Sequence, residues 1–187
     1  MEALLRHLPE IALASALAWG SGLRLYATLF ALGAAGWLGW IELPQHLWLL
    51  AHPLILSASG FMALVEFGTD KLPWLDSAWD AVHTFIRVPA GAALAAAVFG
   101  DGAAALAAAI LGGTLAAGTH LAKAGSRALI NTSPEPFSNW TASFTEDTAV
   151  LGGLWLALAH PAAFLIVLAL LIALAVLLFV WVKRRLR

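Results

Sequence analysis

Most of the chemically versatile side chains in this chain lie in one stretch, residues 66–87, between long apolar segments. Carboxylates and a histidine gathered there could bind a divalent cation or relay protons. Mg²⁺, Ca²⁺ and Mn²⁺ prefer carboxylate oxygens, and imidazole suits Mn²⁺, Zn²⁺ or Fe²⁺. The residues of this stretch that we predict to bind an ion, a divalent metal included, are Glu66, Asp70, Asp80 and His83. The alternative is a salt-bridge cluster of Asp70 or Asp80 with Lys71 and Arg87 that anchors helix ends at the membrane surface.

The spacing of these residues predicts two polar helix faces. Glu66 and Asp70 are four residues apart, so they are neighbours on a helix. A second helix is expected to begin with Asp76 as its N-cap. Spacings of 4, 3 and 4 then give that helix a single polar stripe, which consists of Asp76, Asp80, His83 and Arg87.

Composition indicates a membrane protein. Of 187 residues, 61% are hydrophobic and only 11% are charged, and the mean hydropathy is +0.87. Soluble domains have roughly 45–50% apolar and about 25% charged residues. A net charge of −1 gives no basic surface for nucleic acid. The absence of cysteine excludes disulfides and thiolate metal sites. Motifs of nucleophile elbows, phosphate loops and zinc proteases are absent too, so no catalytic residue is predicted.

The predicted fold is an all-α polytopic membrane bundle of about six transmembrane helices, since one span needs roughly 20 apolar residues. We expect a single transmembrane domain over residues 1–187. The predicted spans are residues 9–40, 47–69, 76–99, 103–124, 140–159 and 162–182. Residues 76–87 could instead lie at the interface, with the apolar piece after them re-entrant. Residues 130–139 are a predicted loop, because Pro134 and Pro136 exclude helix, and Ser138 or Asn139 is the expected cap of the next helix.

Arg24 is the one basic residue deep within an apolar run, directly after Gly20-Ser21-Gly22. We expect a kink or break in the first span there. A central arginine is costly without a partner, and Glu66, Glu146 or Asp147 could supply one. Alternatively, Arg24 could bind an anion beside backbone N–H groups freed by the break. Glu146 and Asp147 are adjacent and should point about 100° apart, so we expect at least one to face the interior.

His120, Lys123 and Arg127 form a further predicted site, on one face of the fourth span. They could hold a phosphate or a lipid head group, or simply fix the topology of the helix end. Six spans put nearly all basic residues on one side, which predicts that both termini are cytoplasmic. The residues on that side are Arg6, Lys71, Arg87, Lys123, Arg127 and the tail 183–187.

A faint internal repeat divides the chain into halves of residues 1–100 and 101–187. Residues 18–23 (AWGSGL) are similar to residues 117–121 (AGTHL), and Glu66 and Glu146 each fall in the second span of a half. Three spans per half would make the two halves inverted with respect to each other, an arrangement common in transporters.

Three segments carry a resemblance to a known family: GSGLRLY, GTDKLPWLDSAWDAVHTFIRVPAGA and KAGSRALINTSPEPFSN. They resemble a bacterial family of integral membrane proteins of unknown function. The resemblance covers nearly the whole chain and implies a bacterial inner (plasma) membrane location, but no activity.

A looser likeness is to the calcium/manganese–proton antiporters, which carry a Glu-x-Gly-Asp-Lys/Arg-Thr/Ser motif in each half. Residues 66–71 (EFGTDK) have one residue more than this motif, which turns Asp70 by about 100° on a helix. Residues 145–148 (TEDT) lack the glycine of the motif.

The leading functional hypothesis is a small transporter or channel for an ion, divalent or proton-coupled, or for a small solute. Its predicted binding residues are Glu66, Asp70, Asp80, His83, Glu146, Asp147 and Arg24. An enzyme that acts on a lipid head group would instead need a cleft open sideways near Asp80, His83 and Lys123. Full pairing of the carboxylates with Lys or Arg would favour a scaffold or assembly protein. The expected partners are the lipid bilayer and a small ion or solute; a homo-oligomer is compatible with the pattern.

Overall fold

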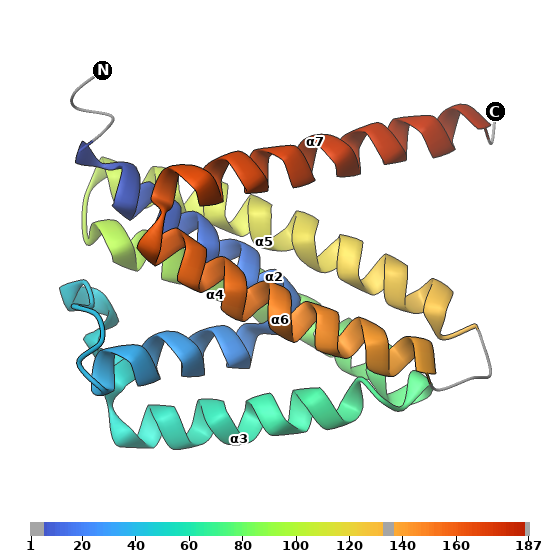
Figure 1. Ribbon diagram of the computed structural model, residues 1–187, viewed down its shortest axis with the longest axis horizontal. Helices are drawn as coiled ribbons and strands as arrows, with labels where there is room; N and C mark the ends of the chain where they lie inside the picture. Colours follow the sequence, from blue (N-terminus) through green and yellow to red (C-terminus); the bar gives the residue numbers. More distant parts are fainter. Residues whose placement is uncertain (1–5, 133–136, 186–187) are drawn as a thin grey trace.

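The protein is an all-α bundle in the computed structural model, which describes residues 6–132 and 137–185. Figure 1 shows most helices running along one long axis. The described elements are α2 (Leu8–Trp37), the 3₁₀ helix η1 (Gln45–Ala51), α3 (Pro53–Thr69), α4 (Pro73–Phe99), α5 (Ala103–Ile130), α6 (Phe137–Ala159) and α7 (Pro161–Arg185). The predicted all-α class is confirmed.

The first helix, α2, is broken at Arg24, whose backbone has φ −144° and ψ 77°. A Cβ atom on Gly20 would lie only 2.6 Å from Thr28 Oγ1. Residues eight apart in a straight helix are about 12 Å apart along its axis. The chain therefore reverses at Arg24, and α2 is a hairpin of two half-helices. The predicted break is confirmed, but it falls just after the glycines and turns the chain back on itself.

Both ends of the α2 hairpin lie at the same end of the bundle. Ile11 lines a groove with Phe99, which precedes the α4–α5 connector, and Ala35 lines another with Ala159, which precedes the α6–α7 connector. Figure 1 shows the same arrangement, with the hairpin tip at mid-bundle. The first helix is therefore re-entrant and does not cross from end to end as expected for residues 9–40.

Small residues allow the hairpin to lie close against α4 and α5. A Cβ atom on Gly22 would be 2.6 Å from the Ala116 carbonyl oxygen and 2.8 Å from Thr119 Cβ. On the α4 side, a Cβ atom on Gly91 would be 2.6 Å from Ser21 Oγ. Close backbone approach at Gly and Ala is how helices pack inside membranes, where little hydrophobic force acts between them.

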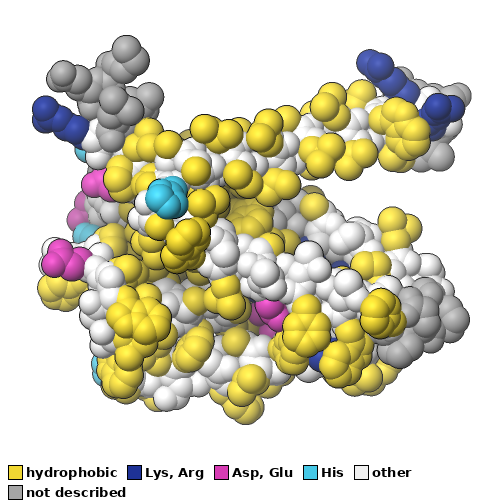
Figure 2. Space-filling model, in the orientation of Figure 1, with side chains coloured by type: hydrophobic (Ala, Val, Ile, Leu, Met, Phe, Trp, Pro, Cys, Tyr) yellow, Lys and Arg dark blue, Asp and Glu magenta, His cyan; other side chains and the backbone are white. Residues whose placement is uncertain are grey.

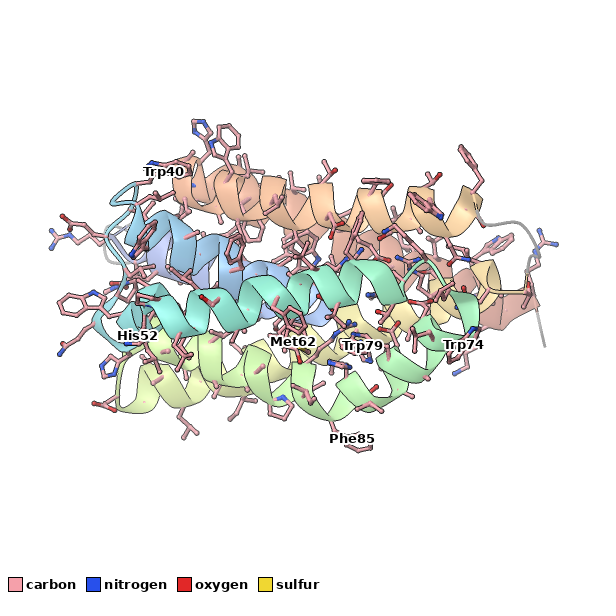
Figure 3. The ribbon with its side chains drawn as sticks, turned by 90° about the horizontal axis from the view of Figure 1, so that it is seen from below. Trp40, His52, Met62, Trp74, Trp79 and Phe85 are labelled. Atoms are coloured by element: carbon pink, nitrogen blue, oxygen red, sulfur yellow. The ribbon has the colours of Figure 1, made fainter. Side chains whose placement is uncertain are left out.

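The predicted second span, residues 47–69, consists of two helices. η1 and α3 meet at an angle of 67°, because the backbone of His52 is extended (φ −69°, ψ 133°). His52 Nδ1 accepts a hydrogen bond from the Leu54 N–H at 3.2 Å and so caps α3. In Figure 3, His52 lies at one end of the bundle and Trp74 at the other, so α3 crosses the bundle between them.

The polar stretch after α3 belongs to a long helix. α4 continues through Pro89 to Phe99. Residues 76–87 and the apolar piece after them therefore form one helix, which is long and apolar enough to cross a membrane. The expected caps are wrong: Leu72 is the N-cap of α4, and Asp76 lies in its first turn. Ser138 and Asn139 lie inside α6, which begins at Phe137. Of the predicted loop, residues 133–136 lie outside the described residues, and Ile130 still belongs to α5.

Within residues 6–132 and 137–185, three helices are long and apolar enough to cross a membrane, namely α4 from Trp74, α5 and α7. The bent pair of η1 and α3 would be a fourth, so six spans are not confirmed. Leu8 of α2 and Arg185 of α7 lie at opposite ends of the long axis in Figure 1, which does not fit two termini on one side. α5 is unbroken whereas α2 reverses, so the two proposed halves differ at this point.

The last helix, α7, has a largely exposed and apolar surface, as expected of a helix that faces lipid. Only Phe164 and Leu168 of its side chains are buried. Figure 2 shows hydrophobic side chains along its whole length, with basic residues at its far end. This agrees with the prediction of an ordinary lipid-facing span.

Replacement of Gly22 by Ala should lower the thermal stability of the protein in detergent, because the new methyl group would meet the backbone of α5. We expect a loss of about 1–3 kcal/mol, the usual cost of overpacking. Gly118→Ala is the matched control, since nothing lies within 4 Å of a Cβ atom there. Ala in place of a helical Gly should stabilise by about 0.5–1 kcal/mol. Equal stability of the two variants would contradict the tight hairpin packing.

Candidate functional site

The tip of the α2 hairpin places Arg24 among carboxylates from α6 and from the end of α3. The Arg24 guanidinium lies 2.5 Å from Asp70 Oδ2, 3.0 Å from Asp147 Oδ1 and 3.4 Å from Glu146 Oε2. It also donates hydrogen bonds to the hydroxyl and the carbonyl of Ser143, at 2.6 and 3.1 Å. Arg24 is only 1% exposed. The predicted pairing of Arg24 with carboxylates across the bundle is therefore confirmed, and Asp70 is a partner that the sequence analysis did not include.

A second arginine organises the part of the site nearer the middle of the bundle. Arg87 of α4 lies 2.5 Å from Glu66 Oε1 and 2.9 Å from Asp80 Oδ1. All three side chains are buried. Glu66, which we considered as a partner for Arg24, thus pairs with Arg87 instead. The predicted pairing of Asp80 with Arg87 is confirmed, but it lies inside the bundle and not on its surface.

Lys123 of α5 connects these two groups. Its Nζ lies 3.4 Å from Glu146 and 3.7 Å from both Asp70 and Asp80. It also donates a hydrogen bond to the Leu23 carbonyl at 3.2 Å, just before the hairpin break. That carbonyl is available because the helix is interrupted at the next residue. The ammonium is therefore central among three carboxylates without close contact to any of them.

Arg127, one helical turn further along α5, makes the most directional contacts of the site. Its Nε and Nη2 donate to the two oxygens of Glu146 at 2.9 and 3.0 Å, a two-point pairing that fixes both side chains. Arg127 also contacts Asp70 Oδ2 at 3.2 Å and Asn139 Oδ1 at 3.3 Å.

The second predicted site is therefore part of the first. His120, Lys123 and Arg127 are all buried, and the two cations face carboxylates of the same protein. They do not form a separate basic surface for phosphate. Arg87 is also buried. Three of the basic residues that were predicted to lie on one side of the membrane, Arg87, Lys123 and Arg127, are therefore in the interior of the bundle.

The hydrogen bonds of His120 assign it a neutral ring. Arg87 Nη1 donates to His120 Nδ1 at 3.1 Å, so Nε2 carries the proton and donates to Thr84 Oγ1 at 2.7 Å. His83 donates from Nδ1 to the Trp79 carbonyl at 2.8 Å, and its Nε2 faces the Tyr26 hydroxyl at 3.1 Å. Neither ring lies within salt-bridge distance of a carboxylate among the residues that the structure describes.

We call this set of ionisable residues, of which Glu146 and Asp147 are half-buried and the others buried, the charge network. Its members are Glu66, Asp70, Asp76, Asp80, Glu146, Asp147, Arg24, Arg87, Lys123 and Arg127. Asp76 is fully buried and accepts a hydrogen bond from Asn131 at 2.8 Å. Six carboxyl groups thus face four cations, and the nearby Lys71 would still leave one carboxyl in excess. The deficit of positive charge is the main chemical property of the site.

Several carboxyl oxygens in the network lack any hydrogen-bond partner among the described protein groups. They are Glu66 Oε2, Asp70 Oδ1, Asp76 Oδ1 and Asp80 Oδ2. A buried acceptor without a donor is costly, so these atoms are where bound protons, water or a cation would be most stabilising.

Lys71 lies at the edge of the network, in the turn between α3 and α4. Its ammonium donates to the Phe67 carbonyl at 2.7 Å and lies 2.8 Å from the centre of the Phe67 ring. Burial lowers the pKa of Lys71, and the positive charge of Arg24 lowers it further.

A divalent metal site is not evident. The described residues include no group of three or more His, Asp, Glu or Cys side chains placed to hold a metal ion. The four predicted ligands are instead divided: Glu66 and Asp80 contact Arg87, Asp70 contacts Arg24 and Arg127, and His83 contacts Tyr26.

Some members of the site were not predicted from the sequence. Asn139 and Ser143 are fully buried and contact Arg127 and Arg24. Their spacing to Glu146, four and then three residues, is the signal that could have placed all three on one inner face of α6. Asp147 nevertheless reaches the same Arg24 Nε as Glu146, although adjacent residues point in different directions. Arg24 approaches between them, which only the hairpin makes feasible.

Fold and site together define a polytopic α-helical membrane protein with a charged interior. A family model described as "Domain of unknown function (DUF4126)" matches residues 11–181, so the chain belongs to that family. The comparison with curated proteins and the comparison with solved structures each found no match.

Arg24→Ala should destabilise the protein by about 3–5 kcal/mol, because it leaves buried carboxylates without their cation. Addition of Asp147→Asn should recover part of this loss, since Arg24 is the one ion-pair partner of Asp147 among the described residues. Thermal unfolding in detergent measures both effects, with the exposed Arg6→Ala as the control. If Arg24→Ala unfolds at the same temperature as Arg6→Ala, Arg24 is not held in a dry charge network.

Proposed function

We propose that the protein is a small membrane transporter or channel for protons or a small cation, with the charge network as its ion-binding region. The observation that carries this proposal is the excess of carboxyl groups over cations inside the bundle. Such an excess favours bound positive charge, because an unpaired charge inside a membrane protein costs several kcal/mol. A proton or a cation supplies that charge.

The re-entrant helix supports this proposal. A half-helix tip inside the bundle leaves backbone groups unsatisfied, and transporters use such breaks to form ion and substrate sites near the bilayer midplane. Here the break brings Arg24 to Asp70, Glu146 and Asp147, and the Leu23 carbonyl to Lys123. A helix interrupted at this point serves no purpose for a passive anchor in lipid.

The contacts of the network carboxylates favour a proton or a monovalent cation over a divalent metal. No described cluster offers three free ligands for a metal, and each ion-paired carboxylate already faces at least one Arg or Lys. A proton can be taken up on an unpartnered oxygen, such as Glu66 Oε2 or Asp80 Oδ2, without displacement of these side chains.

We further propose that the end of the bundle with Lys71 and the C-terminal end of α7 faces the cytoplasm of a bacterial cell, in the inner membrane. Lys183, Arg184 and Arg185 lie in the last turn of α7, at the same end as the α3–α4 turn (Figure 1). Basic residues near span ends favour the cytoplasmic side. The Leu8 end of α2 would then face the other side of the membrane.

A groove between α4 and α5 gives a second candidate, an enzyme or binding protein for lipid head groups. Its volume is about 200 Å³, and its polar lining includes Asp80, Thr84 and Arg127. Arg127 is already bonded to Glu146 and Asp70, which leaves it little capacity for a phosphate. The ion pairs of the network also fit a scaffold, but a scaffold gives no reason for the excess of carboxyl groups.

Glu66→Gln should abolish ion flux in proteoliposomes, because it removes the carboxyl that shares Arg87 with Asp80 and has a free oxygen. Flux of H⁺, Na⁺ and K⁺ is measured with fluorescent indicators, for wild type and variant side by side. Glu10→Gln, on an exposed turn of α2, is the matched control and should keep wild-type flux. Absence of flux for every ion in the wild type, or unchanged flux in Glu66→Gln, would overturn the proposal.

A further inference from the structure

A cleft between α5 and α6 leads from the surface of the bundle to the charge network. α5 packs mainly on α4 and contacts α6 little, although the two follow each other in the chain. The cleft has a volume of about 540 Å³, and Glu146 is part of its lining. Glu146 is 12% exposed, whereas the cations behind it are fully buried. Glu146 is thus the network carboxylate that this cleft makes accessible.

Four hydroxyl groups, those of Ser126, Ser138, Thr141 and Thr145, cover much of the remaining polar lining. Three of them donate their protons to backbone carbonyls. Ser126 donates to the Lys123 carbonyl at 2.8 Å, Thr141 to the Phe137 carbonyl at 2.9 Å, and Thr145 to the Thr141 carbonyl at 2.7 Å. A hydroxyl has one donor and two lone pairs. All three oxygens can therefore present only lone pairs to a molecule in the cleft.

These three oxygens and the Glu146 carboxylate favour a positively charged ligand. Three oxygen acceptors and a carboxylate can coordinate a cation or accept from a protonated group, but they offer nothing to an anion. No Lys or Arg lines the cleft among the described residues. Arg127 and Lys123 lie behind Glu146 and are bonded to it or to its neighbours, so they do not face the opening.

We propose that the α5–α6 cleft is the entry site for the transported ion and takes a monovalent cation, either hydronium or an alkali ion. This inference rests on the proposed function, because it names the ion class and the route to the same network. Ser126, Thr141 and Thr145 coordinate the ion first, and Glu146 then passes the positive charge to the network. At that step Glu146 exchanges part of its pairing with Arg127 for the incoming ion.

The absence of cysteine from the chain allows a direct test of charge selection that does not depend on transport. Thr141→Cys and Thr145→Cys are each purified and reconstituted, and are labelled with a cationic trimethylammonium thiosulfonate or with its anionic sulfonate analogue. Thr114→Cys is the matched control. Thr114 is also an exposed threonine bonded to the carbonyl four residues earlier in its helix, but it lies outside the cleft.

We expect the cationic reagent to label both cleft positions at least about tenfold faster than the anionic one, relative to a free thiol. This is the lower end of the enrichment that a charged cleft gives its counter-ions. Addition of Glu146→Gln should reduce the ratio of the cationic to the anionic labelling rate toward the ratio found for a free thiol. Thr114→Cys should react poorly with either reagent, because it faces lipid. Slower labelling in Na⁺ or K⁺ than in a bulky organic cation would indicate an alkali ion. A decrease at low pH that exceeds the decrease of a free thiol, whose reactive thiolate is itself lost on protonation, would indicate hydronium.

Equal labelling by both reagents, faster labelling by the anion, or no labelling at either cleft position would overturn this inference. Correct folding of each variant is checked by its thermal unfolding temperature, and the two cleft positions serve as checks on each other. Such a failure would leave the Glu66→Gln flux result unaffected. Conversely, a charge-selective cleft in a protein without flux would contradict the proposed function but not the selectivity of the cleft.

Discussion

The burial of Arg24 at the tip of a re-entrant helix is the constraint on which the rest of the structure depends. A guanidinium inside a membrane bundle must have carboxylate partners, and it finds them on two different elements, at the end of α3 and on α6. These carboxylates then require Lys123 and Arg127 of α5, and Asp80 links them to Arg87 of α4 through Lys123. Of the long helices that pack around the hairpin, α3, α4, α5 and α6 are thus joined by charge as well as by packing.

Burial makes this interior both specific and easily perturbed. Replacement of a buried ion pair by apolar residues is often neutral in other proteins, whereas loss of one partner is costly. Each cation of the network contacts two or three carboxylates, so the free-energy cost of losing one partner is shared among several contacts. The binding of one proton therefore changes several contacts at once. The apolar outer surface of α7 and the small residues around Gly22 have the simpler role of holding this interior in lipid.

Much of this arrangement could be predicted from the sequence, since charged residues are few and their helical spacing is regular. The polar faces of α4 and of α3, the break near Arg24 and the need of Arg24 for a carboxylate all follow from residue type and spacing. The reversal of α2 does not, because a glycine-containing break is compatible with a kink as well as with a hairpin. That one ambiguity led to the expected six spans and to termini on one side.

For the same reason, several of the ion-pair partners of the charged residues could not be predicted correctly from the sequence. With a straight first helix, Glu66 and Arg24 are reasonable partners, and Lys123 and Arg127 read as a basic end at the membrane surface. The hairpin stops at mid-bundle, so the space beyond its tip is filled by the ends of α3 and α5 and by the start of α6, which brings those basic residues inside. The caps failed for a local reason: Asp76 and Asn139 serve buried polar partners and not helix ends.

The central claim is that the charge network holds more carboxyl groups than cations and is neutralised by bound positive charge. Infrared difference spectroscopy of the purified protein at neutral pH, in buffer without alkali ions, tests this most directly, because a protonated carboxyl has its own C=O band. We predict such a band in the wild type, its decrease in Glu66→Gln or Asp76→Asn, and its persistence in Glu10→Gln. A wild-type spectrum without a protonated carboxyl would show that every member of the network is ionised, and would contradict this account.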